Sequence, residues 1–229
     1  DAAGLSISEK MRSQIRGLNK ASDNAQDGIS LIQVAEGALN ETHSILQRMN
    51  ELATQAANDT NTSVDRQSIK DEIEQLNEEL DRISSTTQFN KQDLLTGKFS
   101  GKLQVGALEG QTMDLKISTA VSSTGLKVKD IKVSTNENAG KAMKSIQDAI
   151  ESVSKQRSKL GAIQNRLEHT INNLDTNAEN TQAAESRIRD TDMADEMVQY
   201  SKNNILAQAG QSMLAQANQQ TQGVLSLIQ

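Results

Sequence analysis

The chain has 229 residues with a formal net charge of −6, and it contains no Cys, Pro or Trp. This balance argues against a nucleic-acid-binding protein, which needs a concentrated basic patch, and the lack of Cys excludes thiol catalysis, disulfides and thiolate metal sites. Aromatic residues make up only 1% of the chain, and no apolar run approaches the roughly 20 residues of a membrane span. The core must therefore be built from aliphatic seams, as in long packed helices.

The first part of the chain has the periodicity of long helices. Apolar residues recur at steps of three, four or seven, which predicts a coiled-coil-like helix over about 4–57. The polar stretch NDTNTS at 58–63 is typical of a turn, and a second seam predicts a helix over about 64–85. The predicted seam residues are Ile7, Met11, Ile15, Leu18, Ala25, Ile29, Ile32, Ala35, Leu39, Leu46, Met49, Ala53 and Ala56, followed by Ile69, Ile73, Leu76, Leu80 and Ile83.

Residues 88–135 have the character of a small β region. Glycines separate short runs such as KLQV, MDLKIS and LKVKDIKV, which are rich in β-branched and aliphatic residues. The stretch LQVGALEGQTMDLKI predicts a hairpin, with Gly106 and Gly110 on either side of its loop.

A third long helix is predicted over about 139–189. Its seam is interrupted at Arg157, between Val153 and Leu160, and a polar residue there could fix the register. We therefore predict a mainly α fold, an elongated antiparallel bundle of long coiled-coil-like helices over 1–189. A small β-hairpin region is expected at one end, and a C-terminal tail helix over 190–229. The remaining seam residues are Met143, Ile146, Ile150, Leu160, Ile163, Leu167, Ile171 and Leu174.

The tail has helical spacing but no charged residue from Asn203 to Gln229. A helix that faces water normally carries charges on its polar face, and a lone helix gains little from apolar side chains in water. We therefore expect the tail to be covered by other molecules and to be mobile from about residue 194 in the isolated monomer. The predicted contact residues are Ile205, Leu206, Ala209, Met213, Leu214, Ala217, Val224, Leu225, Leu227 and Ile228.

The sequence offers no convincing catalytic or metal site. His43 and His169 are the only histidines, and neither belongs to an H-E-x-x-H motif. The acidic residues at 190–196 lack the Gly and the Glu of a calcium-binding loop, and the Glu-rich stretch 71–81 is typical of a solvated helix face. We predict no enzyme activity, no cofactor and no metal.

Several stretches resemble bacterial flagellin, in the order in which that family has them. They are LQRMNELATQAANDTNT, TTQFNKQDLLTGKF, LQVGALEGQTMDL, LGAIQNRLEHTINNL, AAESRIRDTDMADEM and ILAQAGQSMLAQANQQTQGVLSLI. The resemblance covers essentially the whole chain. The opening DAAGLSISEKMRSQIRGL resembles a segment that lies inside a complete flagellin, which implies that an N-terminal stretch of about 40 residues is absent.

The resemblance implies an extracellular structural subunit that polymerises into the flagellar filament for motility. It implies export in an unfolded state through the flagellar secretion apparatus without a cleavable signal peptide, assembly beneath the filament cap, and an export chaperone that holds the tail. Residues 1–189 would form the shell of the filament and residues 190–229 part of its inner layer. A vertebrate innate receptor would recognise the monomer through Gln47, Arg48, Leu52 and Glu72, where Arg48 offers a planar fork of donors and Leu52 an apolar contact.

Two other readings are open. A hook–filament junction protein shares the terminal helices, but it should lack LQRMNELATQ and NKQDLLTG together, and both are present. A signalling coiled-coil rod, such as a chemoreceptor cytoplasmic domain, predicts a membrane span and an uninterrupted helical hairpin. The Gly-punctuated region at 88–135 argues against that rod.

Overall fold

The computed structural model describes the backbone of residues 2–190 and 193–228, and the side chains of residues 3–190 and 193–220. Contacts divide the chain into two compact units. One is Met11–Gln182, here called the bundle, and the other combines Asp1–Lys10 with Ala183–Gln229. The helices are α1 (Ala2–Ala56), α2 (Ser63–Thr86), α3 (Asn136–Arg189) and α4 (Met193–Ile228), against predicted ranges of 4–57, 64–85, 139–189 and a tail helix.

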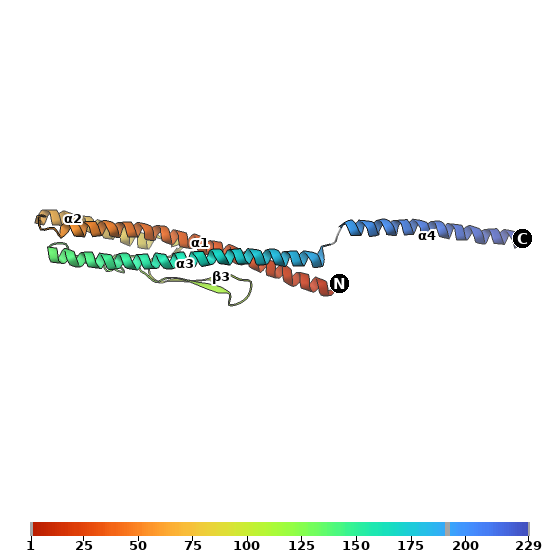
Figure 1. Cartoon of the computed structure of the whole chain (residues 1–229), viewed down its shortest axis with the longest axis horizontal. Coiled ribbons are helices and arrows are strands. Elements are labelled where there is room, and N and C mark those ends of the chain that lie inside the picture. Colours follow the sequence, from red (N-terminus) through yellow and green to blue (C-terminus); the bar gives the residue numbers. More distant parts are fainter. Residues whose placement is uncertain (1, 191–192, 229) are drawn as a thin grey trace. The chain divides into compact units, whose positions relative to one another are not determined.

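The three helices of the bundle lie side by side, with α1 antiparallel to both others (Figure 1). Contacts from α1 to α3 run through Ser22 and Asp175, then Glu36 and Arg157, then Thr54 and Met143. The residue number therefore falls along α3 as it rises along α1. The contact between Arg48 and Glu72 and that between Ala56 and Arg66 follow the same rule for α2. Helices α2 and α3 are consequently parallel to each other, and the predicted antiparallel bundle is confirmed.

The core of the bundle is aliphatic, as the near absence of aromatic residues requires. Leu39, Leu46, Ile146, Leu160 and Leu167 are each fully buried, and they belong to one continuous apolar cluster that includes all three helices. The heptad-like steps predict these positions because residues three and four apart lie on one face of a helix. The predicted seam is too long at its start, where Met11 and Ile15 are half-buried and Ile7, outside the bundle, is exposed.

The polar interruption of the third seam is Gln156 and not Arg157, which corrects the prediction. Gln156 is buried, and its amide donates to the carbonyl oxygen of Lys116 at 3.3 Å. Its Oε1 accepts a hydrogen bond from the Thr119 hydroxyl at 3.4 Å. Arg157 lies at the edge of the seam, with its guanidinium 3.7 Å from the Glu36 carboxylate. An amide can satisfy both of its groups in the core, whereas a charged guanidinium there would need a paired carboxylate.

The predicted hairpin is confirmed. Strands β3 (Phe99–Gln104) and β4 (Thr112–Ile117) pair antiparallel, with Phe99 opposite Ile117 and Gln104 opposite Thr112. Gly110 in the connecting loop has φ +83°, a conformation that favours glycine. A second, very short pair is formed by β1 (Gln88–Phe89) and β2 (Gln92–Asp93).

The third β-type run, residues 126–133, forms turns and irregular structure and no strand, so this expectation was wrong. Its apolar residues Leu126, Val128 and Val133 are buried against the bundle, while Lys127 has φ +59°, which breaks the extended conformation. Alternation of apolar residues and Lys is typical of a half-buried strand, but the same alternation can serve a loop that inserts every second side chain into a core.

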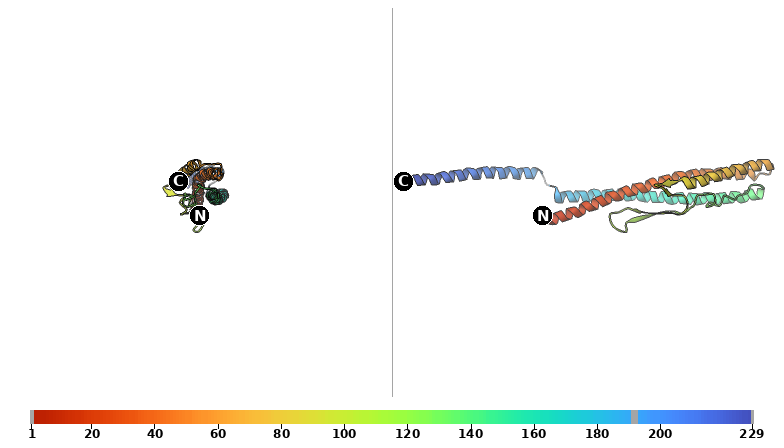
Figure 2. Two further views of the ribbon diagram at one scale, coloured as in Figure 1. Left: turned by 90° about the vertical axis from the view of Figure 1, so that its left-hand side faces the viewer. Right: turned by 180° about the vertical axis from the view of Figure 1, so that it is seen from behind.

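The hairpin lies along the side of α1 and α3, not at one end of the bundle as the sequence suggested (Figures 1 and 2). The Asn24 amide donates to the carbonyl oxygen of Gln104 at 3.1 Å. A Cβ on Gly17 would lie 2.8 Å from the Cβ of Ala107, so the glycine permits the close approach of the hairpin loop to α1. The hairpin and loop thereby close the bundle on one side.

The other unit has a small polar contact and a long exposed helix. The Ser8 hydroxyl donates to the Glu185 carboxylate at 2.6 Å, and Arg189 lies 3.8 Å from Glu9. The described side chains of α4, residues 193–220, are all exposed. Among the described residues, no helix combines the length and the hydropathy needed to cross a membrane.

Candidate assembly and recognition surfaces

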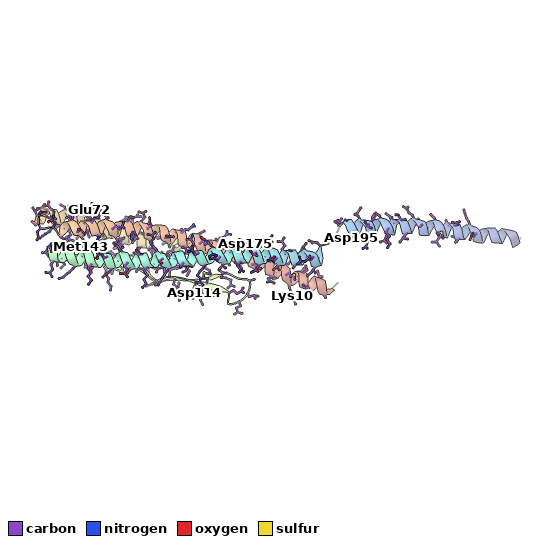
Figure 3. All side chains as sticks on the ribbon, in the orientation of Figure 1. Lys10, Glu72, Asp114, Met143, Asp175 and Asp195 are labelled. Atoms are coloured by element: carbon purple, nitrogen blue, oxygen red, sulfur yellow. The ribbon has the colours of Figure 1, made fainter. Side chains whose placement is uncertain are left out.

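A polar surface on α1 and α2 is organised around Arg48. Its Nε donates to Glu72 at 2.9 Å, and its Nη1 donates to Glu51 at 3.2 Å. Glu72 is labelled on α2 in Figure 3. Hydrogen bonds to Glu72 and then to Glu51 raise the pKa of Arg48 above its ordinary value. The amide of Gln47, the residue directly before Arg48, lies 3.0 Å from the ring of His43, which is one turn earlier on α1. Three of the four residues predicted from the resemblance for receptor contact, Gln47, Arg48 and Glu72, therefore share one exposed surface.

Leu52, the fourth residue, is not part of this surface. It is only 2% exposed and packs in the core with the helices around it. The prediction that it offers an apolar contact beside Arg48 is therefore wrong for the folded bundle. Residues 48 and 52 are one helical turn apart, but Leu52 belongs to the apolar face of α1 together with the buried Met49 and Ala53.

The turn between α1 and α2 is held by Arg66, which sequence reasoning missed. Its guanidinium donates to the carbonyl oxygens of Ala56 at 3.1 Å and Asn58 at 3.3 Å, and it lies 3.0 Å from the Asp59 carboxylate. Nothing in the sequence distinguishes Arg66 from a solvated arginine. A signal was available for the helix start beside it, because the pattern T-x-x-D places Asp65 three residues after the N-cap Thr62.

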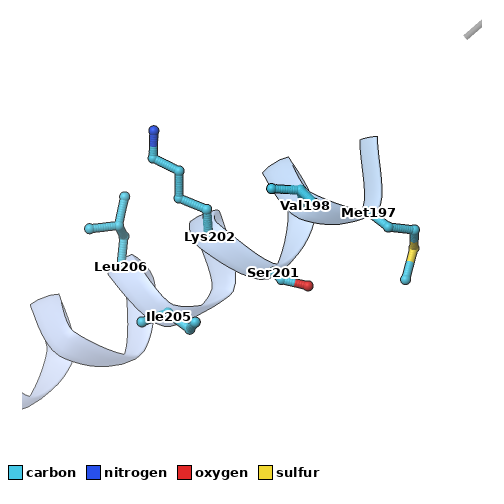
Figure 4. Close-up of a pocket in the computed structure, with 6 residues that line it drawn as sticks. All are labelled: Met197, Val198, Ser201, Lys202, Ile205 and Leu206. Carbon is cyan, nitrogen blue, oxygen red and sulfur yellow. The ribbon is translucent and has the colours of Figure 1, made fainter. Parts of the chain in front are cut away.

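The tail helix presents large apolar side chains to solvent. Ile205 and Met213 are 66% and 68% exposed, and Figure 4 shows Ile205 and Leu206 pointing away from each other around the helix. The predicted residues Ile205, Leu206, Ala209, Met213, Leu214 and Ala217 are all exposed. The backbone of Val224, Leu225, Leu227 and Ile228 belongs to α4, but their side chains lie outside the described residues. Further exposed apolar residues that the prediction omitted are Met193, Met197, Val198 and Tyr200.

The apolar surface of α4 is wider than the single stripe that the sequence suggested. At about 100° per residue, Leu206 and Leu214 lie roughly 100° and 180° around the helix from Ile205. A helix that is apolar over half or more of its circumference is typical of a buried position with neighbours on more than one side. The chain thus combines a bundle that has its own core with a helix that lacks one and that carries no charge from Asn203 onward. These features define a protein that completes its packing by assembling with other molecules.

Neither histidine gathers potential metal ligands. His43 contacts Gln47, and His169 lies near the hairpin loop beside Asn173. Over residues 2–190 and 193–228 there is no group of three His, Asp or Glu side chains placed to hold a metal ion.

Comparison with known proteins identifies the family. Residues 1–100 match the bacterial flagellin N-terminal helical region, and residues 143–228 match the bacterial flagellin C-terminal helical region. The chain is 57% identical to a flagellin of Halalkalibacterium halodurans over 232 residues, which cover all of this chain and 85% of that one. It is 51% identical to a flagellin of Bacillus subtilis, with 100% and 86% of the two chains covered. The chain belongs to the bacterial flagellin family.

Solved structures agree with this assignment. A crystal structure of Bacillus cereus flagellin matches with a TM-score of 0.60 and 32% identity, covering 71% of this chain and 94% of that one. A putative flagellar hook-associated protein from Vibrio parahaemolyticus has a TM-score of 0.70 at 13% identity, with 82% and 98% covered. That second likeness concerns the fold alone. The shared fold does not separate filament from hook-associated proteins, but the high identity to flagellins favours the filament reading.

Proposed function

We propose that this chain is a structural subunit that polymerises into the extracellular flagellar filament of a bacterium and acts by assembly, not by catalysis. One observation carries the proposal: α4 exposes Ile205, Leu206, Met213 and Leu214 in a chain whose bundle is already filled. Burying such side chains is worth roughly 1.5–3 kcal/mol each, a gain that requires copies of the same helix or another partner. Membership of the flagellin family supports copies of the chain as that partner.

The two parts of the chain would occupy different layers of the filament. Residues 1–189, with a core of their own, would form the surrounding shell, and residues 190–229 would contribute to the inner layer. The absence of charge from Asn203 onward supports this division, because a helix packed among copies of itself would have to desolvate any charge it carried.

Before assembly the exposed apolar side chains of α4 need another binding partner. We expect a cytoplasmic export chaperone to bind the apolar face of α4 in a groove, in the manner of other amphipathic helices. The subunit would then pass unfolded through the flagellar secretion apparatus, without a cleavable signal peptide, and add to the filament beneath its cap.

Electron microscopy of the full natural protein after seeding with filament fragments tests the proposal. We expect long filaments from the unaltered protein and none from a variant that carries Ile205→Asp and Leu214→Asp. Circular dichroism of that variant should retain the thermal transition of the bundle. If the unaltered protein does not extend the seeds, or if the variant extends them equally well, the assignment to the tail is wrong.

The surface around Arg48 supports a second role, recognition of the monomer by a vertebrate innate receptor. Gln47, Arg48 and Glu72 are exposed together, and a planar guanidinium held by carboxylates is well suited to a binding hot spot. Arg48→Ala should weaken receptor activation by the monomer. Arg82→Ala is a matched control, because Arg82 makes a similar exposed ion pair with Glu79. Unchanged activation by both Arg48→Ala and Glu72→Ala would exclude this surface.

A further inference from the structure

A groove with cationic walls lies between strand β4 and helix α3. Its lining combines the apolar residues Ala162 and Ile163 with Lys116, Lys159 and Arg166 and a single carboxylate, Asp114. The cavity measures about 460 Å³. Asp114 lies on the hairpin, which runs alongside α3 (Figure 3). Strand and helix residues about 45 positions apart in sequence thus form one surface.

The charges of this groove are not neutralised within the described chain. Lys116, Lys159 and Arg166 are exposed, and none of the ion pairs found among the described residues includes them or Asp114. Three cations and one carboxylate leave a local charge of +2. Lys159 and Arg166 are seven residues apart, so they stand on the same face of α3, roughly 10.5 Å from each other. The groove therefore fits an acidic partner with charges at that spacing.

Helix α2 of this same protein carries such a pattern. It contains seven Asp or Glu against three Lys or Arg, a net charge of −4, whereas residues 88–135 contain seven Lys against four Asp or Glu, a net charge of +3. Asp71, Glu74 and Glu78 are exposed at steps of three and four. Asp71 and Glu78 are again seven residues apart, which matches the spacing of Lys159 and Arg166.

The carboxylates at the two ends of this face are not committed to cations in their own chain. Asp71 accepts a hydrogen bond from the uncharged Gln67 amide at 2.7 Å, and no ion pair of the described residues includes Asp71 or Glu78. Glu74 is 3.2 Å from Lys70, an exposed pair that contributes little. Within one copy, then, the acidic face and the basic groove both remain available for another molecule.

The direction of the helices suits contact between neighbouring copies in a filament. Because α2 and α3 are parallel within the bundle, copies that repeat along one axis present α2 of one copy parallel to α3 of the next. Different surfaces that meet in this way form a heterologous, open-ended contact, the kind that generates filaments. Complementary charge then fixes the register and steers the encounter.

We propose that the groove between β4 and α3 receives the acidic face of α2 from a neighbouring copy, with Lys159 and Arg166 opposite Asp71 and Glu78. The inference rests on the proposed filament function, since it assigns one of the contacts between subunits.

Charge reversal in the full natural protein tests the contact. One variant carries Lys159→Glu and Arg166→Glu, and the other carries Asp71→Lys and Glu78→Lys. Each alone places like charges in the contact and should elongate seeds at least tenfold more slowly than the unaltered protein. An equal mixture of the two variants restores opposite charges at every alternating contact, so it should elongate at close to the unaltered rate. Added salt should reduce the differences in elongation rate between the unaltered protein and the single variants, because salt screens exposed charges.

A matched control separates this contact from net charge and from folding. Lys144→Glu with Lys155→Glu makes the same change of charge on α3 outside the groove, and it should elongate normally. All variants should keep the thermal transition of the unaltered bundle. Normal elongation by either charge-reversed variant alone, or a mixture as slow as its components, would overturn the proposal. Failure of the unaltered protein to elongate would instead overturn the proposed filament function.

Discussion

The bundle of residues 11–182 and helix α4 use the same aliphatic residues in opposite ways. In the bundle, Leu39, Leu46 and Leu160 are fully buried by other helices of the same chain, whereas in α4 Leu206 and Leu214 are 58% and 66% exposed. The bundle surrounds its seams with charged faces, and the tail has no charge from Asn203 onward. Leu content alone thus says little about where a helix finds its partner. The polar residues between the apolar ones indicate whether the rest of the helix faces water or other protein.

The largest expected difference between the two regions is in hydrogen exchange of the isolated monomer. Amides in the middle of α1 and α3 should exchange only through unfolding of the bundle, while those from Leu206 to Leu214 should exchange through local opening of a lone helix, at least about a thousandfold faster. Exchange followed by mass spectrometry measures both regions in one sample. Strong protection of the tail without a partner or self-association would contradict the comparison.

Truncation of one leucine in each region should give the next largest difference. Leu160→Ala should lower the free energy of unfolding of the monomer by about 2–5 kcal/mol, since it leaves a cavity in the core. Leu214→Ala should change it by less than about 0.5 kcal/mol, since the side chain is already exposed. Urea denaturation of the monomer gives both values. In filaments Leu214→Ala should no longer be nearly neutral, because it should raise the rate at which subunits are lost. If both substitutions lowered the free energy of unfolding of the monomer equally, the tail would be packed in the monomer.

A buried polar contact gives a smaller effect, confined to the bundle. Gln156→Ala removes the part-buried hydrogen bonds to the Lys116 carbonyl oxygen and from the Thr119 hydroxyl. At roughly 0.5–1.5 kcal/mol for each bond, the free energy of unfolding should fall by about 1–3 kcal/mol. Gln147→Ala, at an exposed position of the same helix, is the control and should be nearly neutral. If both substitutions lower the free energy of unfolding equally, Gln156 does not hold strand β4 against α3.

Periodicity predicted the helices of the bundle to within three residues at each end, because a seam sustained over many turns averages out local exceptions. It could not choose between Gln156 and Arg157, since adjacent residues fit a seam of steps three and four equally well. It also placed residues 126–133 in a strand, because alternation does not specify which neighbour covers a side chain. The exposed position expected for Leu52 came instead from the resemblance to flagellin, since the spacing along α1 groups Leu52 with the apolar residues Met49 and Ala53.

The surfaces were predictable to different degrees. The uncovered tail could be predicted from composition, and the shared surface of Gln47, Arg48 and Glu72 from resemblance to a family. The groove beside Lys159 could not be predicted, because Asp114 and Lys116 reach it only through the docking of the hairpin along α3. Contacts between residues distant in sequence depend on that tertiary arrangement, which no local pattern encodes.

The smallest expected effect concerns the N-terminus of α2, which follows the turn between α1 and α2. Asp65 accepts hydrogen bonds from the backbone N–H and the hydroxyl of Thr62, both at 2.8 Å, and these bonds lower the pKa of Asp65 below its ordinary value. Thr62→Ala removes one side of this capping box and should lower the free energy of unfolding by about 1 kcal/mol at neutral pH.

The contribution of Asp65 should depend on pH. A carboxylate whose pKa is lower in the folded than in the unfolded state stabilises the fold above its unfolded pKa, near 3.9, and this contribution is lost as the pH falls through the folded value. The stability difference between the unaltered protein and Asp65→Asn should therefore be present at pH 7 and shrink steadily below about pH 4. Thermal unfolding of both proteins across that range is the measurement, and a difference that stays constant into strong acid would show that the carboxylate charge plays no part in the cap.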